Sequence, residues 1–225
     1  GSDTKTKTPN PWRSDSHNLK MLWVPWPPRN PIAFKWMEMD RIMVGNSDNN
    51  TEIAVFGGGC FWCTEAVFSQ LEGVESVVPG DSGGHVDNPN YYQVCDETTG
   101  HAEVSRLQFD PNQISYKDLL SVFFATHDPT TLNRQGADQG ARYRSIILYA
   151  NDDQKEQAEG YVIELSASAA PGSPLVTELK QLEKFWEAEP EHKEYYLRNQ
   201  ASMYCQLVIS PKVQKVREKF AQQLR

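Results

Sequence analysis

Alternation of apolar and polar residues predicts short strands and helices from residue 51 onward. Four segments carry the short or alternating apolar runs that are typical of strands, at 53–56, 74–78, 102–109 and 145–150. Four segments carry apolar residues at helical spacing, at 60–71, 115–127, 151–168 and 210–224. Strands and helices are mixed without internal repeats, which predicts an α+β domain of two layers.

Local signals refine the ends of these elements. Ser115 with Asp118 resembles a capping box, and Ser210 before Pro211 predicts the start of the last helix. Residues 175–186 fit a helix by their apolar period. A long loop at 79–100, rich in Gly, Pro, Asn and Asp, is expected to be functional because long loops in compact domains usually are.

The first fifty residues differ from the rest of the chain. They hold four of the six tryptophans among several prolines, which predicts an extended arm (1–50) packed on a single catalytic domain (51–225). Gly1-Ser2 is typical of a cloning remnant, so we draw no targeting prediction from this end.

The composition excludes several classes of function. A net charge of −8 argues against binding to nucleic acid or to an anionic membrane surface, and no apolar run is long enough for a membrane helix. Four cysteines in 225 residues are too few for a disulfide scaffold. We therefore expect a reducing compartment, cytoplasmic or organellar, and a monomer.

Cys60 is the first candidate for chemistry. It follows a run of three glycines where a strand leads into a helix, so the free amides and dipole of the helix start would favour its thiolate. The alternative is a small buried apolar residue between aromatic neighbours. Cys63 completes a C-x-x-C, a spacing that at a helix start favours thiol–disulfide chemistry.

A zinc site would need a second such pair. Cys95 and Cys205 stand alone, and His85, His101 and His192 have no ligand spacing, so no metal is expected.

Glu103 is the second candidate. On an alternating strand it shares a face with Ser105, Leu107 and Phe109, so its carboxyl is expected to be desolvated and to act as an acid near neutral pH. The alternative is an edge-strand glutamate that reaches solvent.

Several motifs together resemble the peptide methionine-S-sulfoxide reductases, the A family. Gly59-Cys60-Phe61-Trp62 with Glu65 matches the GCFWxxE signature of that family. Further matches follow in the family's order: Gly83-Gly84, Asn88-Pro89-Asn90-Tyr91, Val94-Cys95, Thr99 to Glu103, Asp110-Pro111, Ile114 to Tyr116, His127 to Pro129, Arg134 to Asp138, Tyr143 to Ser145, Ala188-Glu189, His192, Tyr195 and Tyr204-Cys205.

The resemblance implies a role for each matched residue. Cys60 would be the nucleophile and Glu103 the acid, Tyr91 and Tyr143 would donate hydroxyl hydrogen bonds to the sulfoxide oxygen, and Asp138 would be a polar partner in the pocket. The aromatic residues after the nucleophile, Phe61 and Trp62, would hold the S-methyl group. The implied fold is an α/β sandwich with a mixed, mainly antiparallel sheet and a ferredoxin-like core, in which residues 176–180 resemble a strand.

The implied reaction reduces the S-epimer of methionine sulfoxide, free or in proteins. It forms a sulfenic acid on Cys60 and then an intramolecular disulfide, which thioredoxin or another external dithiol reduces without a bound cofactor. Cys205, within the matched Tyr204-Cys205, is the favoured resolving thiol and Cys63 is the alternative. Cys95 is expected to be a buried structural thiol. Asp81 stands where the family commonly has Tyr.

Two other functions fit parts of the sequence. A general disulfide oxidoreductase of the thioredoxin type would explain Cys60 and Cys63 but would give Glu103 and Tyr91 no purpose. A metal-binding or redox-sensing module is the third possibility.

Overall fold

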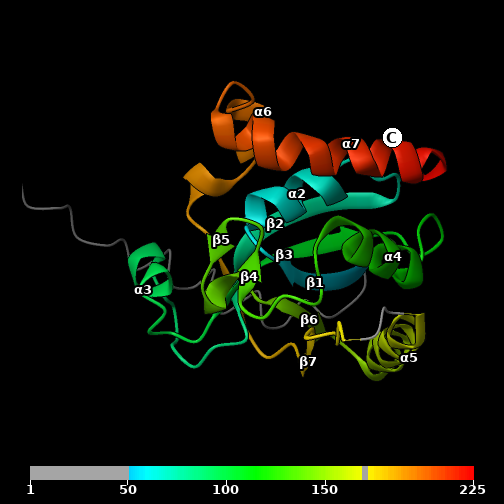
Figure 1. Ribbon diagram of the computed structural model, residues 1–225, viewed down its shortest axis with the longest axis horizontal. Coiled ribbons are helices and arrows are strands. Elements are labelled where there is room, and N and C mark those ends of the chain that lie inside the picture. Colours follow the sequence, from blue (N-terminus) through cyan, green and yellow to red (C-terminus); the bar gives the residue numbers. More distant parts are fainter. Residues whose placement is uncertain (1–50, 169–171) are drawn as a thin grey trace, which may run out of the picture. The chain divides into compact units, whose positions relative to one another are not determined.

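A six-stranded sheet forms the centre of the computed structural model, which describes residues 51–168 and 172–225 (Figure 1). The strands are β1 (Glu52–Gly58), β2 (Val74–Ser82), β3 (Ala102–Phe109), β6 (Ser145–Tyr149), β7 (Glu178–Gln181) and β8 (Phe185–Glu187). Their order is β7-β6-β1-β3-β2-β8, and the pairs are antiparallel except for the parallel β6–β7 pair. The expected mixed, mainly antiparallel sheet is confirmed. A separate hairpin joins β4 (Arg134–Gln135) to β5 (Asp138–Gln139).

The helices interleave with these strands. The α-helices are α2 (Phe61–Phe68), α3 (Tyr91–Cys95), α4 (Tyr116–Thr126), α5 (Asp152–Ser168), α6 (Tyr195–Arg198) and α7 (Ser210–Lys219). Shorter helical turns are η1 (Ala141–Tyr143), η2 (Pro190–His192), the π-helical η3 (Cys205–Ile209) and η4 (Ala221–Gln223). The chain order β1-α2-β2-β3-α4-β6 with the spatial order β6-β1-β3-β2 is the ferredoxin-like arrangement that was expected.

The two faces of the sheet are covered differently. Figure 1 shows α7 running beside α2, and these helices pack with α4 and α5 over a core in which the ring of Phe56 stacks on those of Phe68 and Phe123. On the other face, Leu182 after β7 and Phe185 at the start of β8 pack against the smaller cluster around Val55, Val104 and Ile146. The candidate residues Cys60 and Glu103 lie on the side of the thicker, helical layer, at the ends of β1 and β3.

Helix ends follow the local signals in part. The capping box at Ser115 is confirmed, because its hydroxyl accepts a hydrogen bond from the amide of Asp118 at 3.1 Å. The helix start at Ser210-Pro211 is confirmed, because α7 begins at Ser210 and carries Pro211 in its first turn. Ser210 makes no capping hydrogen bond, however, because the π-helical η3 runs directly into α7. No helix in the described ranges is long and apolar enough to cross a membrane.

The helical interpretation of residues 175–186 is wrong, and the strand that the resemblance implies at 176–180, which we preferred to that helix, corresponds to β7. The segment pairs with β6, crosses the sheet, and pairs with β2 as β8. Both sheet edges offer unpaired backbone groups, and satisfying them outweighs the helical period of the apolar residues. The loop predicted at 79–100 is shorter than expected, because β2 continues to Ser82 and Asn90 caps α3.

Candidate active site

Cys60 lies in the turn between strand β1 and helix α2. It is the N-cap residue of α2, and the preceding Gly59 has φ +98°, a conformation that side chains rarely adopt. A Cβ on Gly57 would lie 2.7 Å from Ile146 Cγ2, so this turn also needs glycine for close packing. The Cys60 side chain is buried, with only 6% of its surface exposed.

Glu103 meets the start of the same helix. Its Oε2 accepts a hydrogen bond from the amide of Phe61 at 3.1 Å, so the carboxyl lies next to the residue that follows Cys60. Burial raises the pKa of Glu103 to about 8, with further increases from Asp81 and Asp138, against the Phe61 hydrogen bond and Arg142. The expectation of a desolvated carboxyl is confirmed, and Glu103 is largely protonated at neutral pH.

The two thiols of the C-x-x-C are in contact. Burial, a hydrogen bond with Cys63 and the charge of Glu103 raise the pKa of the Cys60 thiol. The same hydrogen bond lowers the pKa of Cys63 to about 7 in spite of its burial. At Cys60 burial therefore affects the thiol pKa more than the helix N-terminus does. Cys63 is the first of the two thiols to ionise as the pH rises.

Polar side chains surround the thiols. Tyr204 Oη lies 3.9 Å from Cys63 Sγ and donates a hydrogen bond of 2.7 Å to Asp138 Oδ2. Tyr143 packs against the cluster that contains Cys60, and burial together with the charge of Glu103 raises its pKa. A hydrogen bond with Cys95 is the main cause that raises the pKa of Tyr91 to about 12. Both tyrosine hydroxyls thus stay protonated and can donate.

An aromatic wall continues from the two residues after Cys60. The ring of Trp62 stacks on that of Tyr195, with centroids 3.6 Å apart, and its Nε1 donates to His192 Nδ1 at 3.2 Å. The His192 ring also lies 5.3 Å from that of Phe61 and 5.1 Å from that of Tyr91. Three of the site residues expected from the sequence, Phe61, Trp62 and Tyr91, therefore lie around the ring of His192.

Glu65 holds this wall in place from α2. Its side chain is 4% exposed, and Oε1 accepts a hydrogen bond from the amide of Glu194 at 2.8 Å. Glu194 has φ +51°, a strained position directly before Tyr195. Sequence reasoning gave no role to Glu65, His192, Tyr195 or Tyr204, although all four stood among the matched motifs.

The other two cysteines differ from each other. Cys205 is fully buried in the apolar cluster that contains Cys60 and Cys63. Cys95 is only half-buried, so the prediction that it is a buried structural thiol is wrong: α3 carries it on a short surface helix near Tyr91. All four cysteines, which lie within the described ranges, are free thiols.

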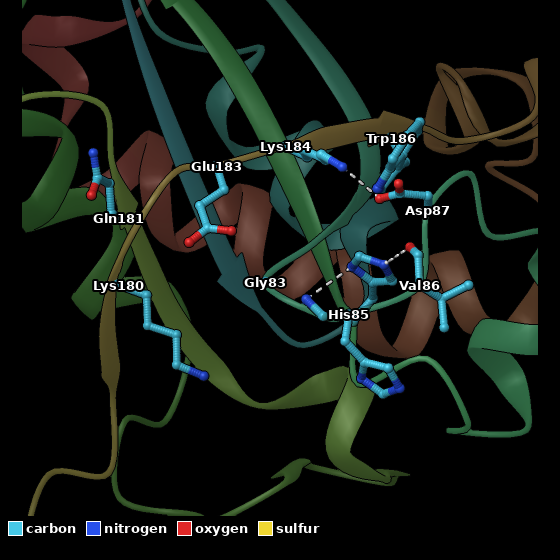
Figure 2. A pocket seen from close by; sticks show the side chains of 11 residues that line it. Gly83, His85, Val86, Asp87, Lys180, Gln181, Glu183, Lys184 and Trp186 are labelled. Carbon is cyan, nitrogen blue, oxygen red and sulfur yellow. Dashed lines mark hydrogen bonds and ion pairs between the residues drawn. The ribbon is translucent and has the colours of Figure 1, made fainter.

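A separate cavity of about 460 Å³ lies between the loop after β2 and the segment from β7 to β8. Figure 2 shows the side chains that line it. Both of its lysines form ion pairs: Lys184 Nζ lies 2.7 Å from Asp87 Oδ1, and Lys180 pairs with Glu178. No group of three His, Cys, Asp or Glu side chains in the described part of the chain could hold a metal ion.

Comparisons with known proteins agree with this site. The family described as "Peptide methionine sulfoxide reductase" matches residues 52–224. The MsrA of Saccharolobus solfataricus is 54% identical over 169 residues, 75% of this chain and 94% of that protein. The MsrA of Chromobacterium violaceum is 52% identical over 170 residues, 76% of this chain and 97% of that protein.

Solved structures show the same fold. Methionine sulfoxide reductase A of Corynebacterium diphtheriae matches with a TM-score of 0.61 at 30% identity, covering 69% of this chain and 78% of that one. Reduced Mxr1 from Saccharomyces cerevisiae matches with a TM-score of 0.63 at 28% identity, covering 73% and 94%. The chain therefore belongs to the peptide methionine sulfoxide reductase family and is an enzyme of the MsrA type that reduces methionine sulfoxide.

Proposed function

We propose that Cys60 and Glu103 are the nucleophile and the acid of this reduction, and that the substrate is the S-epimer. The observation that carries the proposal is the hydrogen bond from the Phe61 amide to Glu103 Oε2, which holds the acid one residue away from the nucleophile. A sulfoxide sulfur is a good electrophile only when its oxygen is protonated or strongly hydrogen-bonded.

The first step transfers the oxygen. Cys60 passes its thiol proton to the Cys63 thiolate and attacks the sulfoxide sulfur, while Glu103 gives its proton to the oxygen. The S–O bond breaks, the hydroxyl moves to Cys60 as a sulfenic acid, and methionine leaves with its sulfur reduced by two electrons. Glu103 is then a carboxylate.

Substrate contacts come from the surrounding side chains. Tyr91 and Tyr143 donate hydrogen bonds to the sulfoxide oxygen as its charge develops. Phe61 and Trp62 contact the S-methyl group, since aromatic rings suit a sulfur-bound methyl. Asp138 holds Tyr204 in place beside the thiols.

We assign Cys63 as the thiol that resolves the sulfenic acid. It already forms a hydrogen bond with Cys60, whereas Cys205 is fully buried in the same cluster and is the alternative. Attack by Cys63 forms the disulfide and releases water. An external dithiol, thioredoxin in this proposal, reduces the disulfide. The chain acts as a monomer in a reducing compartment, cytoplasmic or organellar, where its thiols stay free.

Turnover with S- and R-methionine sulfoxide tests the assignment. We expect reduction of the S-epimer only, with no activity in Cys60→Ser. Cys63→Ser should release one equivalent of methionine and then stop under thioredoxin, whereas Cys205→Ser should continue. If Cys205→Ser stops and Cys63→Ser continues, Cys205 is the resolving thiol. Insulin reduction without sulfoxide would instead favour a general disulfide oxidoreductase.

A further inference from the structure

A second buried carboxyl lies beside Glu103. Asp81 is its partner in the antiparallel β2–β3 register, and the side chains of such partners project from the same face with Cβ atoms about 5 Å apart. Asp81 is 8% exposed and Glu103 is 6% exposed. A carboxyl pair on one sheet face, closed to solvent, is costly when both groups are charged.

A β-bulge creates this pairing. Val74 pairs with Phe109 but Ser76 pairs with Gln108, so the register shifts by one residue near the start of β2. Without the shift Asp81 would lie opposite Ala102, whose side chain belongs to the other face of the sheet. The bulge thus turns Asp81 toward the active site.

The charges around the pair do not neutralise both carboxylates. Arg142 is the cation that faces them: its Nε lies 3.7 Å from Glu103 Oε1, and its Nη1 donates to the Cys95 carbonyl at 2.6 Å. The other charged groups that act on the pair, Glu189 and Asp138, are acidic. Asp81 Oδ1 is buried and has no hydrogen-bond partner among the described residues. One guanidinium therefore faces two carboxyls, and the pair retains a proton.

We propose that Asp81 is a positioning residue for the acid: its carboxylate, placed by the β2 bulge, keeps the proton on Glu103 until the sulfoxide oxygen takes it. The inference rests on the role proposed above for Glu103. No proton needs to pass through Asp81, because its negative charge disfavours a second charge on Glu103 and so acts through it.

The ionisation order agrees with this role. Burial raises the pKa of Asp81 to about 7, and burial followed by the Asp81 charge raises that of Glu103 to about 8. Asp81 therefore ionises first as the pH rises, and its charge delays the ionisation of Glu103. Removing the charge should lower the pH at which Glu103 loses its proton.

The test follows the Glu103 carboxyl directly by ¹³C NMR, with its signal assigned by Glu103→Gln. In Asp81→Asn we expect the titration of Glu103 to move to lower pH by about one unit or more, and the alkaline limb of kcat/KM to move with it. Asp87→Asn is the matched control, since it removes an exposed carboxylate in the loop that follows β2 and should move neither. An unchanged Glu103 titration in Asp81→Asn would overturn the inference.

A second measurement needs no substitution at Asp81. In the unsubstituted protein the Asp81 and Glu103 carboxyl signals should each titrate in two coupled steps. Independent single-step titrations would also overturn the inference. The NMR readout is separate from turnover, so an inactive but coupled pair would count against the role of Glu103 in catalysis and not against the pairing.

Discussion

Glu103 on strand β3 and Glu65 on helix α2 are buried to a similar extent, but their side chains contact different groups. Each is less than a tenth exposed, and each accepts a hydrogen bond from a backbone amide. Burial raises the pKa of Glu65 to about 7 and that of Glu103 to about 8. Glu65 accepts hydrogen bonds from backbone amides and has Glu194 and Arg198 as its charged neighbours, whereas Glu103 faces Arg142, Asp81 and the thiol of Cys60.

The comparison separates two uses of a desolvated carboxyl. Burial is the largest cause of the raised carboxyl pKa on both elements, and acidic neighbours add to it at Glu103. The protonated carboxyl of Glu103 lies beside the proposed nucleophile and can donate its proton. The carboxyl of Glu65 instead holds the segment that carries Tyr195 against Trp62. Substitutions at the two glutamates should therefore have different effects on turnover and on stability.

Glu103→Gln should have the largest effect. The amide keeps the shape and can still accept from the Phe61 N–H, but it cannot give a proton, so methionine release in a single turnover should slow by roughly 10²- to 10⁴-fold. The free energy of unfolding at pH 7 should change little or rise. A slowing of less than about tenfold would show that another group is the acid.

Glu65→Ala should act on stability and substrate binding. The Glu194 amide loses its acceptor, which costs about 1 to 3 kcal/mol in the free energy of unfolding measured in urea. Since Tyr195 loses its anchor, KM should rise several-fold with a smaller change in kcat. Glu65→Gln is the matched control and should retain most of both; equal loss of kcat in the two variants would place Glu65 in the chemistry.

Both glutamates should make stability depend on pH. Their folded pKa values lie above the unfolded value near 4.3, so their contribution is full below about pH 4 and is lost as the pH rises to about 8. Each carboxyl contributes at most about 1.4 kcal/mol per pH unit in this window. Urea unfolding at pH 5 to 8 should show a shallower fall in Glu65→Gln and in Glu103→Gln; identical slopes would contradict the raised pKa values.

An exposed glutamate gives the smallest expected effect. Glu164 is 71% exposed and lies 3.8 Å from Lys117 Nζ, a surface ion pair without burial. Glu164→Gln should change the free energy of unfolding by less than about 0.5 kcal/mol and leave turnover unchanged. A larger change in urea unfolding would show that the charge of the partner, rather than burial, determines how much these carboxyls contribute to stability.

Much of the site could be read from local sequence rules. The glycine run places Cys60 at a helix start, and strand alternation puts Glu103 on the apolar face, because both depend on residues adjacent in the chain. The segment 175–186 could not be read this way, since its strands form only by pairing with β6 and β2. The partnership of Asp81 with Glu103 depends on a bulge near Val74, which no local pattern marks.

Single-turnover labelling in a Cys63→Ser/Cys205→Ser background shows which cysteine takes the sulfoxide oxygen. After one equivalent of S-methionine sulfoxide, a sulfenic-acid probe and mass spectrometry locate the oxidised cysteine in this background. Methionine release in a single turnover is timed from pH 6 to 10 in the unsubstituted protein, which keeps the Cys63 thiolate that accepts the Cys60 proton. We expect the label on Cys60 and a rate that falls as the pH rises through about 8, where Glu103 loses its proton. Label on Cys95, or a rate that does not change through this range, would contradict the pairing of Cys60 with a protonated Glu103.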